Sequence, residues 1–228
     1  MFLECQEDKL SLQQIESIKE FYSVELLAPV KYNKTRVVTS RVPQCMLDVI
    51  EGSGFKFIEA IVLNFFTPAW MHIDAINRNY VASDPLAVCV FPLGLTTNEY
   101  NASLGNRLPK MLITNQRHPT LRGAFLANGV EQYIVDRVSE DNPLNKMLTD
   151  YSSLENLSSE PFPRDVWFDR YSFMPYEFFN GLSYRCEWDW KPGNVMIIDK
   201  SVVHTPSSFN NIGISKKSLV ITNIVYNG

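Results

Sequence analysis

The stretch MHIDAINRNY places His72 two residues before Asp74, after an apolar run that is typical of a strand. The chain contains only three histidines, His72, His118 and His204. A His-x-Asp triplet alone is more often an ordinary turn at a strand end. If residues 72–74 are extended, however, the imidazole and the carboxylate project to the same face, because side chains alternate along a strand. Two such ligands could hold a metal if a neighbouring strand supplied a third.

His204 is the candidate for that third ligand. It ends the run VMIIDKSVVH, 132 positions after His72 (204 − 72 = 132). Two histidines and one carboxylate on one side of a metal leave three coordination positions open, which is the facial triad of non-haem Fe(II) oxygenases. A single carboxylate leaves part of the iron's charge uncompensated, so an anionic co-substrate could bind beside it. We expect His118, which precedes a proline, to lie in a loop with a structural or substrate-facing role.

A cation and a hydroxyl follow His204 at a suggestive spacing. After a polar Asn-Asn-Ile-Gly turn, Lys216 enters the final strand 12 positions later (216 − 204 = 12), with Ser218 two residues on. Lys216 and Ser218 therefore share a face of that strand and could hold the distant carboxylate of a metal-bound ligand. Lys217 is the alternative cation. Asn64, on the strand before the triplet, could face the same ligand or serve as a buried hydrogen-bonding residue.

In this order, these residues resemble the motif of the 2-oxoglutarate- and Fe(II)-dependent dioxygenases. That motif is His-x-Asp, a distal His, and a basic residue ten or more positions further, often with Ser two residues later. The segment WKPGNVMIIDKSVVHT is also similar to the family's Gly-Asp-x-x-x-Phe-Asp…His segment, with Gly193, Asp199 and His204 in step. The resemblance covers roughly residues 55–95 and 184–227.

Three departures from the family pattern stand out. The basic residue is a lysine where arginine is commoner, and Lys216 has a second lysine, Lys217, beside it. Asn194 replaces the usual acidic residue after Gly193. The gap between the two ligand histidines is long, which implies an insertion. None of these departures removes a metal ligand, and because Asp74 is present we do not expect halogenation.

The resemblance implies a double-stranded β-helix, or jelly roll, that binds Fe(II) and 2-oxoglutarate and uses O₂. It implies an oxidoreductase, most simply a hydroxylase acting on a C–H bond of a small molecule or an amino-acid side chain. The substrate itself stays open among a free amino acid, a peptide side chain, a small metabolite and a nucleobase. The residues that it assigns are His72, Asp74 and His204 as iron ligands and Lys216, Ser218 and Asn64 as co-substrate contacts. The alternatives are a cupin-like metal enzyme that does not use 2-oxoglutarate and a non-catalytic jelly-roll binding module.

Composition is compatible with this function and excludes others. The chain has 228 residues, 45% of them apolar and 20% charged, and a net charge of −4. These values favour one globular domain over residues 1–228 and give no electrostatic reason to expect a nucleic-acid partner. We expect no secretory signal and no membrane span. The four cysteines are far apart, which favours reduced thiols and a cytoplasmic location. The oligomeric state stays open.

The pattern along the chain predicts a mainly β fold with flanking helices. Two N-terminal helices are expected at about 10–52, the first with a capping box of Ser11 and Gln14. An insertion at about 98–182, partly helical, could form a lid or outer wall over the site. Its aromatic stretch could wall a pocket or pack a core. Strands are expected at 55–66, 86–95 (closed by Pro92 and Gly94), 110–116, 182–190, 193–204 and 217–226.

Overall fold

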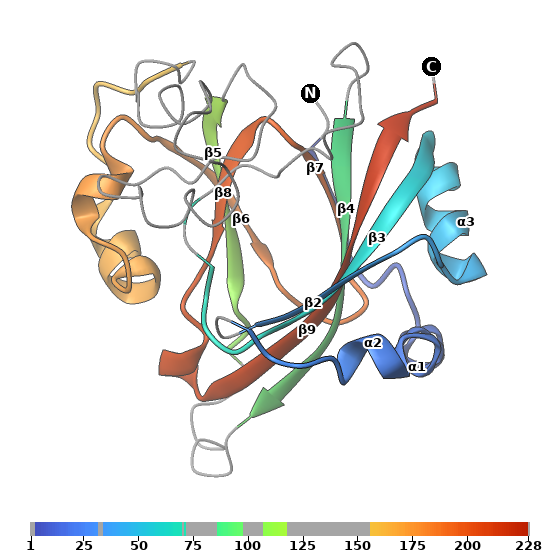
Figure 1. Ribbon diagram of the computed structural model, residues 1–228. Helices are drawn as coiled ribbons and strands as arrows, with labels where there is room; N and C mark the ends of the chain where they lie inside the picture. Colours follow the sequence, from blue (N-terminus) through green and yellow to red (C-terminus); the bar gives the residue numbers. More distant parts are fainter. Residues whose placement is uncertain are drawn as a thin grey trace, which may run out of the picture.

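Two antiparallel β-sheets face each other in the computed structural model (Figure 1). The structure describes residues 3–31, 34–69, 71, 86–97, 107–117 and 156–227. The larger sheet has the strand order β1-β7-β4-β9-β3-β2, and the smaller sheet has the order β6-β5-β8. The strands of the larger sheet are β1 (Leu3–Gln6), β2 (Lys34–Thr39), β3 (Phe55–Phe65), β4 (Leu86–Thr97), β7 (Val195–Asp199) and β9 (Ile214–Tyr226). Those of the smaller sheet are β5 (Lys110–Arg117), β6 (Tyr184–Asp189) and β8 (Val202–Pro206).

Helices cover the outer face of the larger sheet. They are α1 (Leu12–Phe21), α2 (Ser23–Leu26) and α3 (Gln44–Gly52). Helix α1 begins at the predicted capping box, in which the side chain of Ser11 accepts from the backbone of Gln14 and the Gln14 side chain accepts from the backbone of Ser11. Ile15 and Ile18 of this helix are buried against the sheet. The two predicted helices are therefore confirmed.

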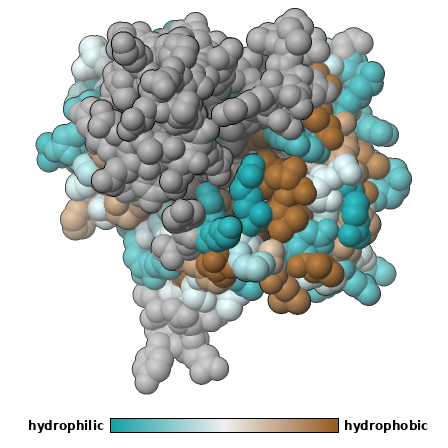
Figure 2. Space-filling model, in the orientation of Figure 1, coloured by the Kyte–Doolittle hydropathy of each residue, from teal (hydrophilic) through white to brown (hydrophobic). Residues whose placement is uncertain are grey.

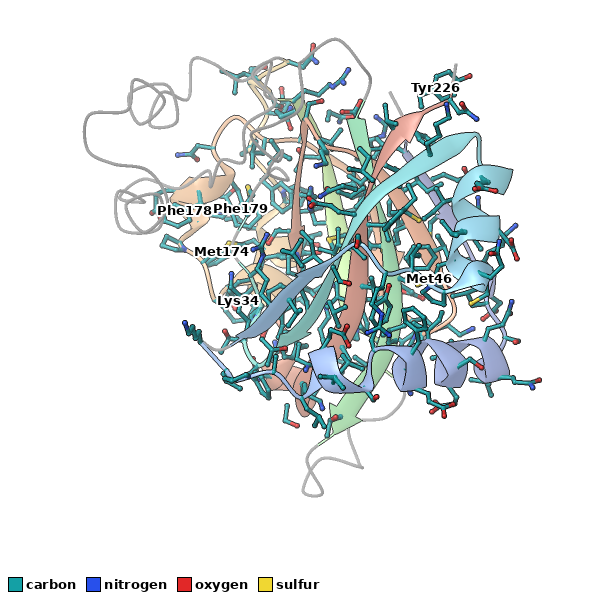
Figure 3. The ribbon with its side chains drawn as sticks, turned by 45° about the vertical axis from the view of Figure 1, so that its right-hand side comes forward. Lys34, Met46, Met174, Phe178, Phe179 and Tyr226 are labelled. Atoms are coloured by element: carbon teal, nitrogen blue, oxygen red, sulfur yellow. The ribbon has the colours of Figure 1, made fainter. Side chains whose placement is uncertain are left out.

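The buried apolar residues form three cores. The helix-side core lies between the helices and the larger sheet, a second core lies between the two sheets, and the third, the outer core, lies on the far face of the smaller sheet. Between the sheets pack residues such as Leu63, Val90, Ile113 and Leu219. The third core is made by residues 156–182, which contain α6 (Arg164–Val166), η3 (Trp167–Tyr171) and η4 (Tyr176–Phe179). The predicted aromatic stretch thus packs a core over the smaller sheet. In Figure 3 its members Met174, Phe178 and Phe179 lie together, far from Met46 of α3.

The predicted strands are present, but two of their limits are wrong. Strand β4 continues through Pro92 and Gly94 to Thr97, and its pairing with β9 is irregular between those two residues. Such a bulge accommodates a proline, which has no N–H for the ladder. The single strand predicted at 193–204 is two strands, β7 and β8, which belong to different sheets.

The predicted insertion at 98–182 contains a strand of the second sheet. That strand, β5, lies between β6 and β8 and was itself predicted at 110–116. Residues 98–106 and 118–155 lie outside the described part of the chain, so the lid stays a prediction. No helix among the described residues combines the length and apolar character that crossing a membrane requires.

The visible surface of the molecule is a mosaic of hydrophilic and apolar side chains rather than one apolar face (Figure 2). Exposed large apolar side chains are few among the described residues and include Leu12 of α1 and Leu27 after α2. Scattered exposed apolar residues are normal for a folded protein. The apolar residues that hold the fold together therefore lie between its layers.

The packing of α1 against the sheet predicts that substitutions at its buried and exposed positions will change the free energy of unfolding by different amounts. Replacing Ile18, which is 0% exposed, with alanine should lower the free energy of unfolding by about 2–5 kcal/mol, since the variant loses buried methylenes and leaves a cavity. The matched control is Leu12→Ala in the same helix, where the side chain is 79% exposed and the expected change is within about 0.5 kcal/mol. Urea denaturation measures both. Equal losses would mean that α1 is not anchored through Ile18.

Candidate active site

A cavity opens between the two sheets, and His204 and Lys217 both line it. They are the ionisable groups among its lining residues. The rest of the lining is apolar or aromatic and includes Phe65, Trp190 and Phe209. The cavity thus holds a metal-binding type of side chain and a basic side chain in largely apolar surroundings.

His204 points into this cavity because of its place on β8. Val202, two residues earlier, packs between the sheets, whereas Val203 packs in the outer core of the smaller sheet. His204 is 3% exposed, and its Nδ1 lies 3.0 Å from the carbonyl oxygen of Val202. A carbonyl oxygen only accepts, so Nδ1 carries the hydrogen. In the neutral ring the lone pair is then on Nε2, which is the arrangement of a metal-ligating histidine oriented by a backbone carbonyl.

The turn that leads to His204 is held by a small polar network. A carboxylate oxygen of Asp199 accepts from the backbone N–H and the hydroxyl of Ser201, at 3.0 and 2.7 Å. The other carboxylate oxygen accepts from Arg117 at 2.7 Å, and Arg117 Nε also donates to the Ser201 hydroxyl. This network holds the crossing from β7 to β8. Sequence reasoning placed Asp199 in the motif but missed Arg117, whose only signal was its position at the end of a predicted strand.

Gly193 and Asn194 fix the other end of β7. Gly193 has a φ of +97°, and a Cβ there would lie 2.9 Å from the carbonyl oxygen of Leu10, so a side chain would be strained and crowded. The Asn194 side chain accepts from the backbone N–H of Asp8 and donates to the carbonyl oxygen of Asp189. A carboxylate could only accept. Asparagine therefore makes a pair of contacts here that the family's usual acidic residue could not.

Lys217 is a buried cation held by aromatic rings. Its Nζ lies 4.4 Å from the centroid of the Trp190 ring and 5.4 Å from that of Phe209, within the range of cation–π attraction. No carboxylate of the described residues forms an ion pair with it. Burial disfavours the charged amine and lowers the pKa of Lys217 from its usual 10.5 to about 7.

The structure corrects the predicted face of the final strand. Leu219 and Ile221 line the cavity with Lys217, whereas Ser218 and Val220 lie on the opposite, helix-covered face. Lys216 follows the alternation of Ser218 and does not line the cavity. The predicted sharing of a face by residues 216 and 218 therefore holds, but that face is not the one toward His204.

Asn64 is also on the helix side. It pairs with Ser218 across β3 and β9, and the Ser218 hydroxyl donates to Asn64 Oδ1 at 2.6 Å. Asn64 Nδ2 donates to the carbonyl oxygen of Leu26 at 2.7 Å, at the end of α2. Its side chain is thus a buried bridge between the sheet and the helix layer. Of the two roles that the sequence left open for Asn64, these contacts are those of a buried hydrogen-bonding residue, and strand alternation turns Ser218 away from the cavity as well.

His72, Asp74 and His118 lie outside the described residues. The described residues contain no group of three His, Cys, Asp or Glu side chains that could hold a metal. Ala69 lines the cavity with His204, and its carbonyl oxygen accepts from the Thr205 hydroxyl at 3.4 Å. The chain that leads into the His-x-Asp triplet therefore touches the residue next to His204.

No protein-family model and no curated protein matches this chain. Solved structures do match. HygX from Streptomyces hygroscopicus, crystallised with nickel and 2-oxoglutarate bound, has a TM-score of 0.50 at 10% identity, over 98% of this chain and 82% of HygX. SnoK, a non-haem α-ketoglutarate-dependent carbocyclase from nogalamycin biosynthesis, has a TM-score of 0.49 at 13% identity, over 98% and 79% of the two chains. A Pseudomonas putida prolyl-4-hydroxylase has a TM-score of 0.42 at 11% identity, over 99% and 92%.

At these identities the likeness is one of fold. The structural neighbours are 2-oxoglutarate/Fe(II)-dependent oxygenases, the family that the sequence motif resembles. The predicted mainly β jelly roll is confirmed.

The buried lysine predicts an unusual dependence of stability on pH. Between about pH 7 and 10.5 the unfolded chain carries a proton on Lys217 that the folded protein lacks. The free energy of unfolding, measured without metal or co-substrate, should therefore rise with pH across this window, by up to about 1.4 kcal/mol per pH unit. Lys217→Met should remove this rise and be the more stable protein near pH 7.

The control for this measurement is Lys216→Met, the neighbouring lysine outside the cavity. Denaturant titrations at several pH values should show the same pH slope for this variant as for the unchanged protein. If Lys217→Met also keeps the slope, the amine of Lys217 is solvated in the folded state and the burial argument is wrong.

Proposed function

We propose that this chain is an Fe(II)- and 2-oxoglutarate-dependent dioxygenase, most simply a hydroxylase. The observation that carries the proposal is that His204 and the buried amine of Lys217 line the same largely apolar cavity. A buried histidine by itself can be an ordinary residue of the protein core. A lysine buried among aromatic rings with no carboxylate partner among the described residues favours an anionic ligand, because the charged form of its amine is costly to bury unless an anion lies beside it.

His72, Asp74 and His204 are the residues that would hold the iron. The donor set is two imidazoles and one carboxylate, which suits Fe(II) and leaves positions open for other ligands. Support comes from the Nδ1 contact of His204 and from the contact between Thr205 and Ala69, three residues before His72. The second contact brings Ala69 beside the residue that follows His204.

Lys217, rather than Lys216, would hold the 5-carboxylate of 2-oxoglutarate. Charge balance supports a dicarboxylate ligand: iron with one aspartate keeps one positive charge, and Lys217 adds another, so two carboxylates would neutralise both. Lys217 and Leu219 face the cavity from β9, and Trp190 flanks the ammonium. The 1-carboxylate and the 2-keto oxygen would then face the metal.

The bound metal and co-substrate would together supply the activation of O₂ for oxidation of a C–H bond. The chain's part is to orient the co-substrate between His204 and Lys217 and to exclude water with the apolar lining. We further propose that the insertion at about 98–182 serves as a lid or outer wall that admits a small molecule or an amino-acid side chain. Of its described residues, 156–182 pack outside the smaller sheet.

The first test concerns the metal. Anaerobic addition of Fe(II) and 2-oxoglutarate should produce a weak visible charge-transfer band, and His72→Ala, Asp74→Ala or His204→Ala should each abolish it, because each change removes a ligand. His118→Ala is the control and should keep the band. Metal binding without 2-oxoglutarate-dependent succinate formation would favour a cupin-like enzyme, and failure to bind any divalent metal would favour a non-catalytic module.

The second test concerns the co-substrate. Lys217→Ala should weaken 2-oxoglutarate binding by roughly two to three and a half orders of magnitude, since breaking a buried charged pair costs about 3–5 kcal/mol. Iron affinity should stay nearly unchanged. Lys216→Ala should alter neither, because Lys216 does not line the cavity. Calorimetric titration separates the two ligands. The reverse ranking of the two lysines would place the co-substrate on the helix side of β9 and contradict this assignment.

A further inference from the structure

Met71, the residue before the predicted metal ligand His72, is held in place by both its side chain and its backbone. Its side chain is 1% exposed and belongs to the outer core of the smaller sheet, together with Val203, the residue before His204. Its backbone N–H donates to the thioether sulfur of Met174 at 3.3 Å. One residue is therefore held both by its side chain and by its main chain.

Met174 is itself rigidly supported. Its backbone N–H donates to the carbonyl oxygen of Tyr171 at 2.9 Å, and its carbonyl oxygen accepts from the indole N–H of Trp167 at 2.9 Å. The Tyr171 hydroxyl donates to Glu187 of β6 at 2.6 Å, and Arg170 pairs with the same carboxylate. A chain of contacts thus runs from the smaller sheet, through Tyr171 and Met174, to the main chain at Met71.

We propose that Met174 is a positioning residue for the metal centre, because it fixes the main chain one peptide before His72. This inference rests on the proposed iron-binding role of His72. Consecutive Cα atoms are about 3.8 Å apart, so we expect a change that loosens Met71 to loosen the neighbouring ligand as well. Metal ligands must be placed to within a few tenths of an ångström, and residues that support ligands typically contribute 10–100-fold to metal affinity.

A thioether suits this position because the surroundings are apolar. Phe162, Phe178 and Phe179 pack in the same cluster, where a more polar acceptor would be costly to bury. Sulfur accepts weakly, yet it keeps the Met71 N–H from being buried without a partner. Leucine would fill a similar volume but offers no acceptor. Replacing Met174 with leucine therefore removes the hydrogen-bond acceptor while keeping a similar side-chain volume.

The test compares Met174→Leu with Met46→Leu. Met46 is equally buried but lies in the helix-side core on α3. Anaerobic titration with Co(II) alone should show about tenfold weaker metal affinity for Met174→Leu and unchanged affinity for Met46→Leu. The melting temperature should fall further for Met174→Leu, because the Met71 N–H loses its acceptor. The visible spectrum of the Co(II)-loaded Met174→Leu protein should also change, which a loss of stability alone would not cause. Met174→Gln, which restores an acceptor, should recover part of the affinity.

Two outcomes separate this inference from the proposed function. If Met174→Leu binds Co(II) as tightly as the unchanged protein while His72→Ala does not bind it, Met174 does not position the ligand and the iron site stands. If His72→Ala binds Co(II) as tightly as the unchanged protein, the iron site itself is wrong. Equal losses of affinity in Met174→Leu and Met46→Leu would reduce Met174 to a packing residue and overturn the inference.

Discussion

The burial of one ammonium group between two sheets is the constraint on which the rest of the site depends. A charged amine loses its hydration in such a place, and only the electron-rich faces of Trp190 and Phe209 attract it among the described residues. A chain selected only for stability would gain by placing an apolar side chain there. The cost is understandable if the cavity is built for an anion, and it also explains why the lining around Lys217 is so apolar.

The second requirement is that the main chain carry His204 across from one sheet to the other. Strands β7 and β8 are each buried on both faces, so neither can bend gradually around a solvated edge. The crossing is made instead in the short polar turn of Asp199, Lys200 and Ser201. Arg117, at the end of β5, pairs with Asp199 and donates to Ser201. The ion pair therefore helps to set the direction in which β8 leaves this turn.

The outer layers support the cavity from two sides. Helices α1 and α3 bury the far face of the larger sheet, while Asn64 and Ser218 link that sheet to α2. Residues 156–182 bury the far face of the smaller sheet and reach the main chain at Met71. Several polar contacts among the described residues thus join one layer to another, and His204 and Lys217 are the ionisable residues that line the cavity between the sheets.

The sequence alone determined the local elements and the order of the chemical groups. The capping box of Ser11 starts α1 because it is satisfied by residues three apart, and the apolar runs form strands because both of their faces are buried. The same local rule showed that Lys216 and Ser218 share a face, whereas His204 was singled out by its place at the end of an apolar run and by the scarcity of histidines. Strand periodicity, however, only sorts residues into two sets. Which set faces the ligand is decided by what packs on each side, and here the helix layer takes Ser218 and Asn64 while the cavity takes Lys217. The passage of β4 through Pro92 and the change of sheet after Asp199 likewise depend on partners distant in sequence, β9 and Arg117, so only the tertiary structure could settle them.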